Sequence, residues 1–197
     1  MKKIVPKDAI LIPENAECVF KGIIFDVYQW QQKLFDGSST TFEMLRRVDT
    51  VKAICVVDDK IIVLDEDQPM APARGYEFPG GRVERGADSY LKEIQREVLE
   101  ETGYRFANWK LVHVQQSSQH VEGFFYYFVA TNPIEHIAPN HDSGEHINVE
   151  QLSFEQLRQR VLDPRGSMGY IAGFFDPLRT LDDLLKLPEF VGQEVDR

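Results

Sequence analysis

Three glutamates near one end of a predicted helix have the types and spacing that suggest chemistry. Glu97, Glu100 and Glu101 share one side of a helix expected over residues 88–102, together with Glu93. Carboxylates three or four residues apart repel each other, and the C-terminal end of a helix already carries partial negative charge. A hard divalent cation such as Mg²⁺, which prefers oxygen ligands, would compensate for this crowding. The alternative is an ordinary solvated charged face.

The helix that carries these glutamates is indicated by its apolar spacing and its ends. At about 3.6 residues per turn, one stripe should face the core. This stripe consists of Leu91, Ile94 and Val98. Asp88 or Ser89 can cap the start, and Gly103 suits the left-handed position after the last turn. Lys92 and Arg96 do not fully neutralise the acidic side, which favours a metal site over a solvated face.

The stretch from Gly81 to Tyr104 resembles the Nudix box, a pattern of glycine, arginine and glutamate at fixed spacing. Its second half, REVLEETGY (96–104), matches the pattern at every position. Its first half departs from the pattern, because Asp88 stands one residue too far from Gly81 and the usual spacing reaches Ala87 instead. On the matching half, the chain is identified as a member of the Nudix family.

The resemblance implies hydrolysis of a nucleoside diphosphate linked to another group, with Mg²⁺ or Mn²⁺ as cofactor. Carried over by position, Glu97 and Glu101 would be the main metal ligands, with Glu100 assisting. The main-chain carbonyl of Gly80 would complete part of the metal shell, and Arg96 would orient the carboxylates. Bound cations withdraw charge from the pyrophosphate, stabilise charge developing at phosphorus, and lower the pKa of a bound water.

Beyond the box, the chain resembles the ADP-ribose and ADP-sugar pyrophosphatase branch over most of residues 18–160. The resemblance rests on a sheet before the core, on EFPGGRVE (77–84), and on DSGEHINVEQLSFEQL (142–157). It implies that an acidic loop supplies a further metal ligand or the general base. Glu145 is the matching candidate for both roles, with Asp142 second, and an ordinary loop acid is the alternative.

Substrate contacts outside the box are less well defined. The branch often carries Gln-Tyr-Arg after the second core strand, whereas this chain has DEDQPMAPARGYEF (65–78). Arg74 or Arg82 could contact phosphate instead, or could be surface charges. Tyr28 and Trp30 could stack on an adenine across a dimer interface, or could serve dimer packing alone.

The elements that must position the box are predicted from periodicity and turn signals. An antiparallel sheet is expected at 18–48, and a hairpin at 51–57 and 60–64. The remaining expected elements are a loop at 69–79, strands at 109–115 and 124–130, and helices at 154–162 and 177–187. Ser153 and Gln156 form a capping-box pair for the first of these helices. The aromatic run 124–128 should alternate between two packed faces.

Strands and helices mix without a strict βαβ rhythm, which favours an α/β or α+β fold. With the resemblance, the expected fold is a Nudix α/β/α sandwich with a mixed sheet, preceded by a small N-terminal antiparallel sheet. Residues 1–48 are predicted to form this sheet and to join two chains in a homodimer. Residues 49–197 are predicted to form the Nudix hydrolase domain.

Composition limits the possible partners. The 197 residues carry a formal charge of −10, which argues against binding to nucleic acid. No segment reads as a signal peptide or a membrane span, so a cytoplasmic protein is expected. Cys18 and Cys55 do not suggest a disulfide framework, and the five histidines have no metal-ligand spacing. Cys55 is expected to be a buried thiol.

The sequence thus predicts Mg²⁺-dependent hydrolysis of ADP-ribose or a nucleotide sugar to a nucleoside monophosphate and a sugar phosphate. One alternative is hydrolysis of nucleoside triphosphates or dinucleoside polyphosphates. The other is a Nudix-fold sensor that binds nucleotide sugars without cleaving them, which would be expected to lack Glu97 or Glu101.

Overall fold

The computed structural model describes residues 2–69, 71–141, 144 and 146–196. The core begins with an antiparallel hairpin of β5 (Thr50–Val57) and β6 (Lys60–Gln68), as the sequence predicts. Its turn residues, Asp58 and Asp59, have φ of 47° and 61°, the left-handed conformation of a two-residue hairpin turn. Because β5 is buried along its whole length, it forms the centre of the domain.

The segment expected to be a loop contains a strand, β7 (Ala71–Glu77), which pairs antiparallel with β6. The expectation of a loop over 69–79 is therefore wrong for this part. Within the described chain, β7 pairs with β6 alone. Pro72 thus lies in an edge strand, where a missing backbone N–H is tolerated.

Two long strands, β8 (Tyr104–Ser118) and β9 (Val121–His136), pair antiparallel, and β9 runs parallel to β5. Both strands exceed the predicted ranges 109–115 and 124–130. Register shifts at three places let them bend and twist while they stay paired. On the other side of the hairpin, β10 (His146–Ser153) pairs antiparallel with β6.

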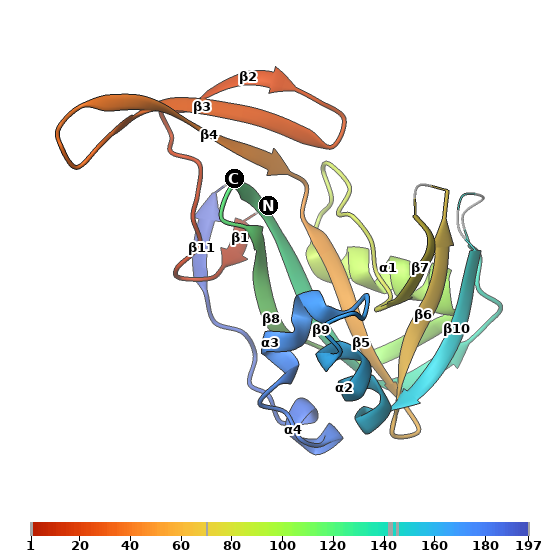
Figure 1. Cartoon of the computed structure of the whole chain (residues 1–197). Coiled ribbons are helices and arrows are strands. Elements are labelled where there is room, and N and C mark those ends of the chain that lie inside the picture. Colours follow the sequence, from red (N-terminus) through yellow and green to blue (C-terminus); the bar gives the residue numbers. More distant parts are fainter. Residues whose placement is uncertain (1, 70, 142–143, 145, 197) are drawn as a thin grey trace.

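The N-terminal part of the chain forms the expected antiparallel sheet, which projects from the core in Figure 1. Its strands are β2 (Glu17–Lys21), β3 (Phe25–Lys33) and β4 (Ser39–Arg47). A short parallel pairing attaches β4 to β9, with Leu45 opposite Val121 and Arg46 opposite Glu122. Strands β2 to β10 therefore make one mixed sheet in the order β10-β6-β5-β9-β4-β3-β2, with β7 on β6 and β8 on β9.

The helices lie between and after these strands. They are α1 (Tyr90–Thr102), α2 (Phe154–Leu162), the 3₁₀ turn η1 (Gly169–Ile171), α3 (Ala172–Phe175) and α4 (Leu181–Leu185). The predicted capping box of Ser153 and Gln156 is confirmed at the start of α2. The helix expected over 177–187 is shorter, because Thr180 and Asp183 form a capping box that starts α4 late.

Two hydrophobic cores cover the two faces of the sheet, as a sandwich requires. On one face Ile54 packs with Leu157 of α2, and on the other Cys55 packs with Ile94 of α1. Figure 1 shows α1 on one side of the sheet and α2 to α4 on the other. The aromatic run 124–128 also alternates between the two cores, as predicted. Burial raises the pKa of the Cys55 thiol well above its ordinary value, which fits the expected inert residue.

The first and last strands of the described chain form a separate two-stranded sheet. β1 (Lys2–Val5) pairs antiparallel with β11 (Gln193–Asp196), so the two termini lie close together (Figure 1). The Lys3 ammonium lies 2.8 Å from the buried Asp49 carboxylate, which ties this sheet to the start of β5. No helix in the part of the chain described here has the length and apolar character needed to cross a membrane.

Candidate active site

Helix α1 is fixed at both ends by the residues that the sequence suggests. The Ser89 hydroxyl accepts from the Lys92 N–H at 3.1 Å, and Gly103 ends the helix with φ of 75°. A side chain at Gly103 would place its Cβ 2.0 Å from the Ile137 carbonyl oxygen. The predicted buried stripe is correct for Ile94 and Val98 and wrong for Leu91, which is 39% exposed. The last buried position is taken by Thr102, whose hydroxyl donates to the Val98 carbonyl at 2.5 Å.

The glycine turn before the helix is held against β5 by main-chain hydrogen bonds. The Val51 N–H donates to the Gly81 carbonyl at 2.9 Å, and the Ala53 N–H donates to the Pro79 carbonyl at 2.8 Å. Gly80 has φ of 134°, and a Cβ there would lie 2.1 Å from the Val51 carbonyl oxygen. Only glycine allows this conformation and this close approach.

The turn meets α1 through two of the predicted ligand residues. The Gly80 N–H donates to Glu101 Oε2 at 2.7 Å. A Cβ at Gly81 would lie 2.6 Å from Glu97 Oε1, so the missing side chain makes room for this carboxylate. Glu97 and Glu101, one helical turn apart, therefore both face the Gly80–Gly81 pair.

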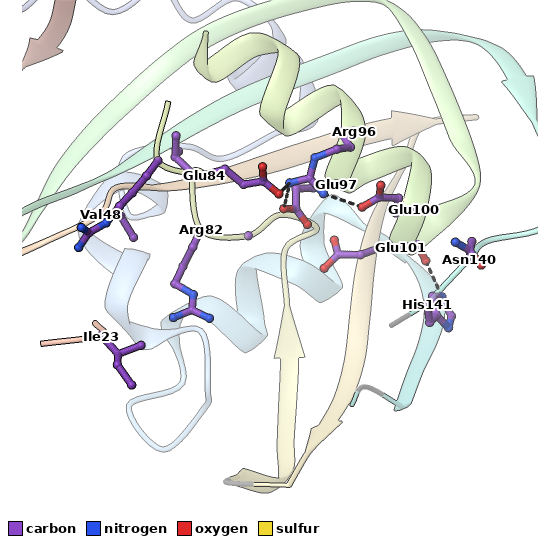
Figure 2. A pocket seen from close by; sticks show the side chains of 13 residues that line it. Ile23, Val48, Arg82, Glu84, Arg96, Glu97, Glu100, Glu101, Asn140 and His141 are labelled. Atoms are coloured by element: carbon purple, nitrogen blue, oxygen red, sulfur yellow. Dashed lines mark hydrogen bonds and ion pairs between the residues drawn. The ribbon is translucent and has the colours of Figure 1, made fainter. Parts of the chain in front are cut away.

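Arg96 lies among the remaining carboxylates of the helix, as Figure 2 shows. Its Nη1 donates to Glu100 Oε2 at 2.7 Å and its Nη2 donates to Glu97 Oε1 at 2.7 Å. Glu93 Oε2 lies 3.3 Å from the same Nη2. Burial by itself would lower the pKa of the Arg96 guanidinium, but Glu97 and Glu100 outweigh it and raise this pKa. Arg96 thus holds the directions of the Glu97 and Glu100 carboxylates.

These groups border a cavity of about 430 Å³. It is lined by Ile23, Val48, Gly81, Arg82, Val83, Glu84, Arg85, Arg96, Glu97, Glu100, Glu101, Asn140 and His141. Glu97, Glu100 and Glu101 come from α1, whereas Arg82, Glu84 and Arg85 come from the loop before it. The cavity therefore brings carboxylates suited to a cation next to guanidinium groups suited to an anion.

The predicted ligand side chains carry the oxygen donors that a divalent cation prefers. Glu97 and Glu101 supply hard oxygen donors at the border of the cavity, which fits Mg²⁺ or Mn²⁺. However, the described residues contain no ready-made group of three or more His, Cys, Asp or Glu side chains that could hold a metal. The three carboxylates accept hydrogen bonds from protein groups instead. Glu97 and Glu100 accept from the Arg96 guanidinium, and Glu101 accepts from the Gly80 N–H. Glu145 and Asp142 lie outside the described residues.

Residues 46–169 match the NUDIX domain family model, a span that includes the box, β5 and the cavity-lining loop. The chain belongs to the Nudix family. A stretch of 89 residues is 29% identical to an ADP-ribose pyrophosphatase of Bacillus subtilis (strain 168) and covers 45% of this chain and 48% of that protein. The match thus spans about half the length of that relative.

The fold of this Nudix protein is also similar to a solved structure described as an ADP compounds hydrolase. The TM-score is 0.64 over 89% of this chain and 95% of the other, at 19% identity. The likeness confirms the expected Nudix sandwich, including the antiparallel extension.

Two cavity residues of the Nudix domain, Asn140 and His141, carried no signal in the sequence. The Asn140 N–H donates to the Glu100 carbonyl at 2.8 Å, and His141 Nε2 lies 2.9 Å from the Glu101 carbonyl oxygen, to which it donates. Both residues close the C-terminal end of α1, whose last carbonyls lack helical partners. These two contacts depend on chain segments far apart in the sequence. Glu84, within the box itself, lies 4.0 Å from the Arg96 Nη2.

The irregular first half of the Nudix box places neither Asp88 nor Ala87 at the cavity. Asp88 is exposed and forms an ion pair with Lys92 at 2.8 Å, and Ala87 packs against the core. Arg74 lies in β7, and its side chain is not described. Of the two arginines considered for phosphate, Arg82 lines the cavity.

Tyr28 and Trp30 of the N-terminal sheet make contacts within their own chain. The Arg46 guanidinium lies over the Tyr28 ring at 4.4 Å, and its Nη1 donates to the Tyr28 hydroxyl at 2.9 Å. Trp30 packs against Phe42 with ring centroids 6.0 Å apart. Stacking of either ring on an adenine stays a prediction.

Proposed function

We propose that this protein hydrolyses the pyrophosphate bond of a nucleoside diphosphate linked to another moiety, with ADP-ribose or a nucleotide sugar as substrate. The products are a nucleoside monophosphate and a sugar phosphate. The placement of the Glu97 and Glu101 carboxylates against the Gly80–Gly81 turn, at the edge of a cavity, carries the proposal. The name of the Bacillus subtilis relative, an ADP-ribose pyrophosphatase, supports the choice of substrate.

The residues that would hold Mg²⁺, or Mn²⁺ in its place, are Glu97, Glu100, Glu101, Glu145 and the Gly80 carbonyl. When bound, the cation supplies charge neutralisation at the phosphates and lowers the pKa of a coordinated water. Arg96 keeps Glu97 and Glu100 in fixed directions through its two 2.7 Å hydrogen bonds. Glu145 would act as a further ligand or as the general base.

Arg82 is proposed to bind a substrate phosphate. It faces the cavity, and no hydrogen bond or ion pair of its guanidinium is seen among the described residues. Its backbone pairs with Thr50, whose hydroxyl accepts from Arg47 Nη2 at 2.9 Å, so a second guanidinium lies nearby. Burial and then Arg82 lower the pKa of Arg47. Two neighbouring guanidinium groups suit an anion between or beside them.

We expect Arg82→Ala to raise KM for ADP-ribose about tenfold with a smaller change in kcat. A hydrogen bond to a charged group contributes about 1.5–3 kcal/mol, which accounts for this factor. Steady-state kinetics with Arg105→Ala as control would measure it, because Arg105 is an exposed arginine paired with Glu135 on β8 and β9. An unchanged KM in Arg82→Ala would assign phosphate binding to other groups.

The N-terminal region, residues 1–48, is proposed to join two chains in a homodimer. Its sheet exposes apolar side chains that a monomer would leave in water: Val19, Phe20, Ile23, Ile24, Phe25, Leu34, Phe35 and Phe42. Exposed apolar side chains in such number are typical of an interface. Light scattering coupled to size exclusion should give twice the chain mass of 22.7 kDa. A mass of one chain at micromolar concentration would contradict the dimer.

The substrate proposal is tested by product analysis with Mg²⁺. The panel holds ADP-ribose, ADP-glucose, UDP-glucose, GDP-mannose, a diadenosine polyphosphate and the nucleoside triphosphates. Formation of AMP and ribose 5-phosphate from ADP-ribose is the expected result. Turnover confined to triphosphates or dinucleotides would keep the metal site and exclude the proposed substrate class. Binding without cleavage, in Mg²⁺ and in Mn²⁺, would favour a sensor.

A further inference from the structure

Lys52 is a buried cation next to the Gly80–Gly81 turn. It lies in β5 and is only 6% exposed. Its Nζ donates to the main-chain carbonyls of Phe78 at 2.9 Å and Gly80 at 3.3 Å, and it lies 3.5 Å from Glu77 Oε2. A buried ammonium is costly unless it is paired and hydrogen-bonded, and these three contacts satisfy it. All three partner residues lie at the end of β7 or in the turn just before the Nudix box.

The Gly80 residue is consequently held on both of its polar groups. Its N–H donates to Glu101 Oε2 at 2.7 Å, and its carbonyl accepts from Lys52 at 3.3 Å. The neighbouring carbonyls of Pro79 and Gly81 accept from the N–H groups of Ala53 and Val51, which flank Lys52 in β5. The side chain of Lys52 thus completes a row of bonds from β5 that sets the direction of the Gly80 carbonyl.

We propose that Lys52 is a positioning residue that aims the Gly80 carbonyl at a divalent cation. A carbonyl oxygen has two lone pairs, so it can accept from Lys52 and still bind a cation. The inference rests on the proposed function, because it assigns a task to a residue behind one of the proposed ligands. Groups behind metal ligands typically change metal affinity or activity by about 10–100-fold when they are removed.

Lys52 is connected through Glu77 to a segment far away in the sequence. Glu77 is buried, and its Oε2 accepts from the Tyr170 hydroxyl at 2.7 Å. Tyr170 belongs to η1, after α2, and its main-chain carbonyl accepts from Gln115 Nε2 at 3.1 Å. Tyr170 therefore fixes Glu77, Glu77 fixes Lys52, and Lys52 fixes the Gly80 carbonyl. The C-terminal part of the domain takes part in this arrangement.

The direction in which cation affinity changes when Lys52 is replaced distinguishes a positioning role from a purely electrostatic one. By Coulomb's law, a positive charge near a cation site repels the cation, so its removal alone would tighten cation binding. Loss of a group that aims a ligand oxygen would weaken cation binding instead. Replacement of Lys52 by an uncharged side chain of similar length therefore gives opposite results under the two accounts.

The test is direct Mn²⁺ binding to the full chain, measured without substrate from the electron paramagnetic resonance signal of free Mn²⁺. We expect Lys52→Met to raise the dissociation constant for Mn²⁺ about tenfold. Lys110→Met is the matched control, because Lys110 also donates to two main-chain carbonyls, those of Leu185 at 2.9 Å and Leu187 at 2.6 Å, away from the cavity. Unchanged or tighter binding in folded Lys52→Met would overturn the proposal.

A second variant covers the case in which Lys52→Met fails to fold. Tyr170→Phe removes one hydroxyl, and we expect a smaller increase of the Mn²⁺ dissociation constant. Tyr76→Phe is its control, since the Tyr76 hydroxyl donates to Glu150 instead of Glu77. Wild-type affinity in Tyr170→Phe would then overturn the inference. If the wild-type protein bound no Mn²⁺, the proposed metal site would itself fail, an outcome distinct from wild-type binding that the variants leave unchanged.

Discussion

The Glu101→Gln variant is expected to fold normally and to lose about three orders of magnitude in kcat for ADP-ribose hydrolysis. Its amide oxygen can still accept from the Gly80 N–H, which the carboxylate binds at 2.7 Å, so the turn keeps its anchor. The negative charge that would bind a divalent cation is lost. Stabilisation by a bound cation amounts to several kcal/mol, and each 1.36 kcal/mol changes the rate about tenfold.

The measurement is AMP formation at saturating Mg²⁺, together with the thermal unfolding midpoint. Glu155→Gln serves as the control, because Glu155 is an exposed carboxylate in the first turn of α2. Its activity should match that of the wild type. Activity of Glu101→Gln within tenfold of the wild type would remove Glu101 from the proposed set of metal ligands.

The Gly80→Ala variant is expected to lose about 3 kcal/mol of unfolding free energy, and most of its activity with it. Its φ of 134° is unfavourable for an L-residue, and the new Cβ would lie 2.1 Å from the Val51 carbonyl oxygen. Backbone strain at such a position costs about 1–3 kcal/mol, and the clash forces the turn away from β5 as well. The carbonyl and N–H of Gly80 would then leave the positions that Lys52 and Glu101 hold.

Urea unfolding gives this free energy, and Gly86→Ala is the matched control. Gly86 also has a positive φ, 92°, but nothing lies within 4 Å of a Cβ built there. Gly86→Ala should therefore lose only the unfolding free energy that the unfavourable backbone conformation costs, about 1–2 kcal/mol, and should keep its activity. Equal losses in the two variants would show that the contact with Val51 adds nothing to the strain of the backbone.

Local signals explain why much of the site could be predicted. The start of α1 at Ser89 and its end at Gly103 depend on the residues next to them, through a side-chain cap and a left-handed backbone. The two-residue turn at Asp58-Asp59 similarly defines the β5–β6 hairpin. The family, the sandwich and the acidic side of the helix follow from patterns of this kind.

Predictions failed where neighbours in space override neighbours in sequence. The prolines near β7 suggested a loop, but the open edge of β6 accepts a strand there. Leu91 fits the apolar period of α1, yet the core does not cover it fully, and Thr102 is buried instead.

The sequence by itself determined the composition of the site: a glycine pair, a helix with Glu97 and Glu101 one turn apart, and an arginine on the same helix. The arginine, Arg96, directly precedes Glu97. These features lie within one short stretch, so spacing and helix geometry are enough to relate them. Only the tertiary structure decided that His141 closes the end of α1 and that Lys52 and Tyr170 support the Gly80 carbonyl. Those contacts form after β5, the glycine turn and η1 are packed together, and no local pattern records which distant side chains then meet.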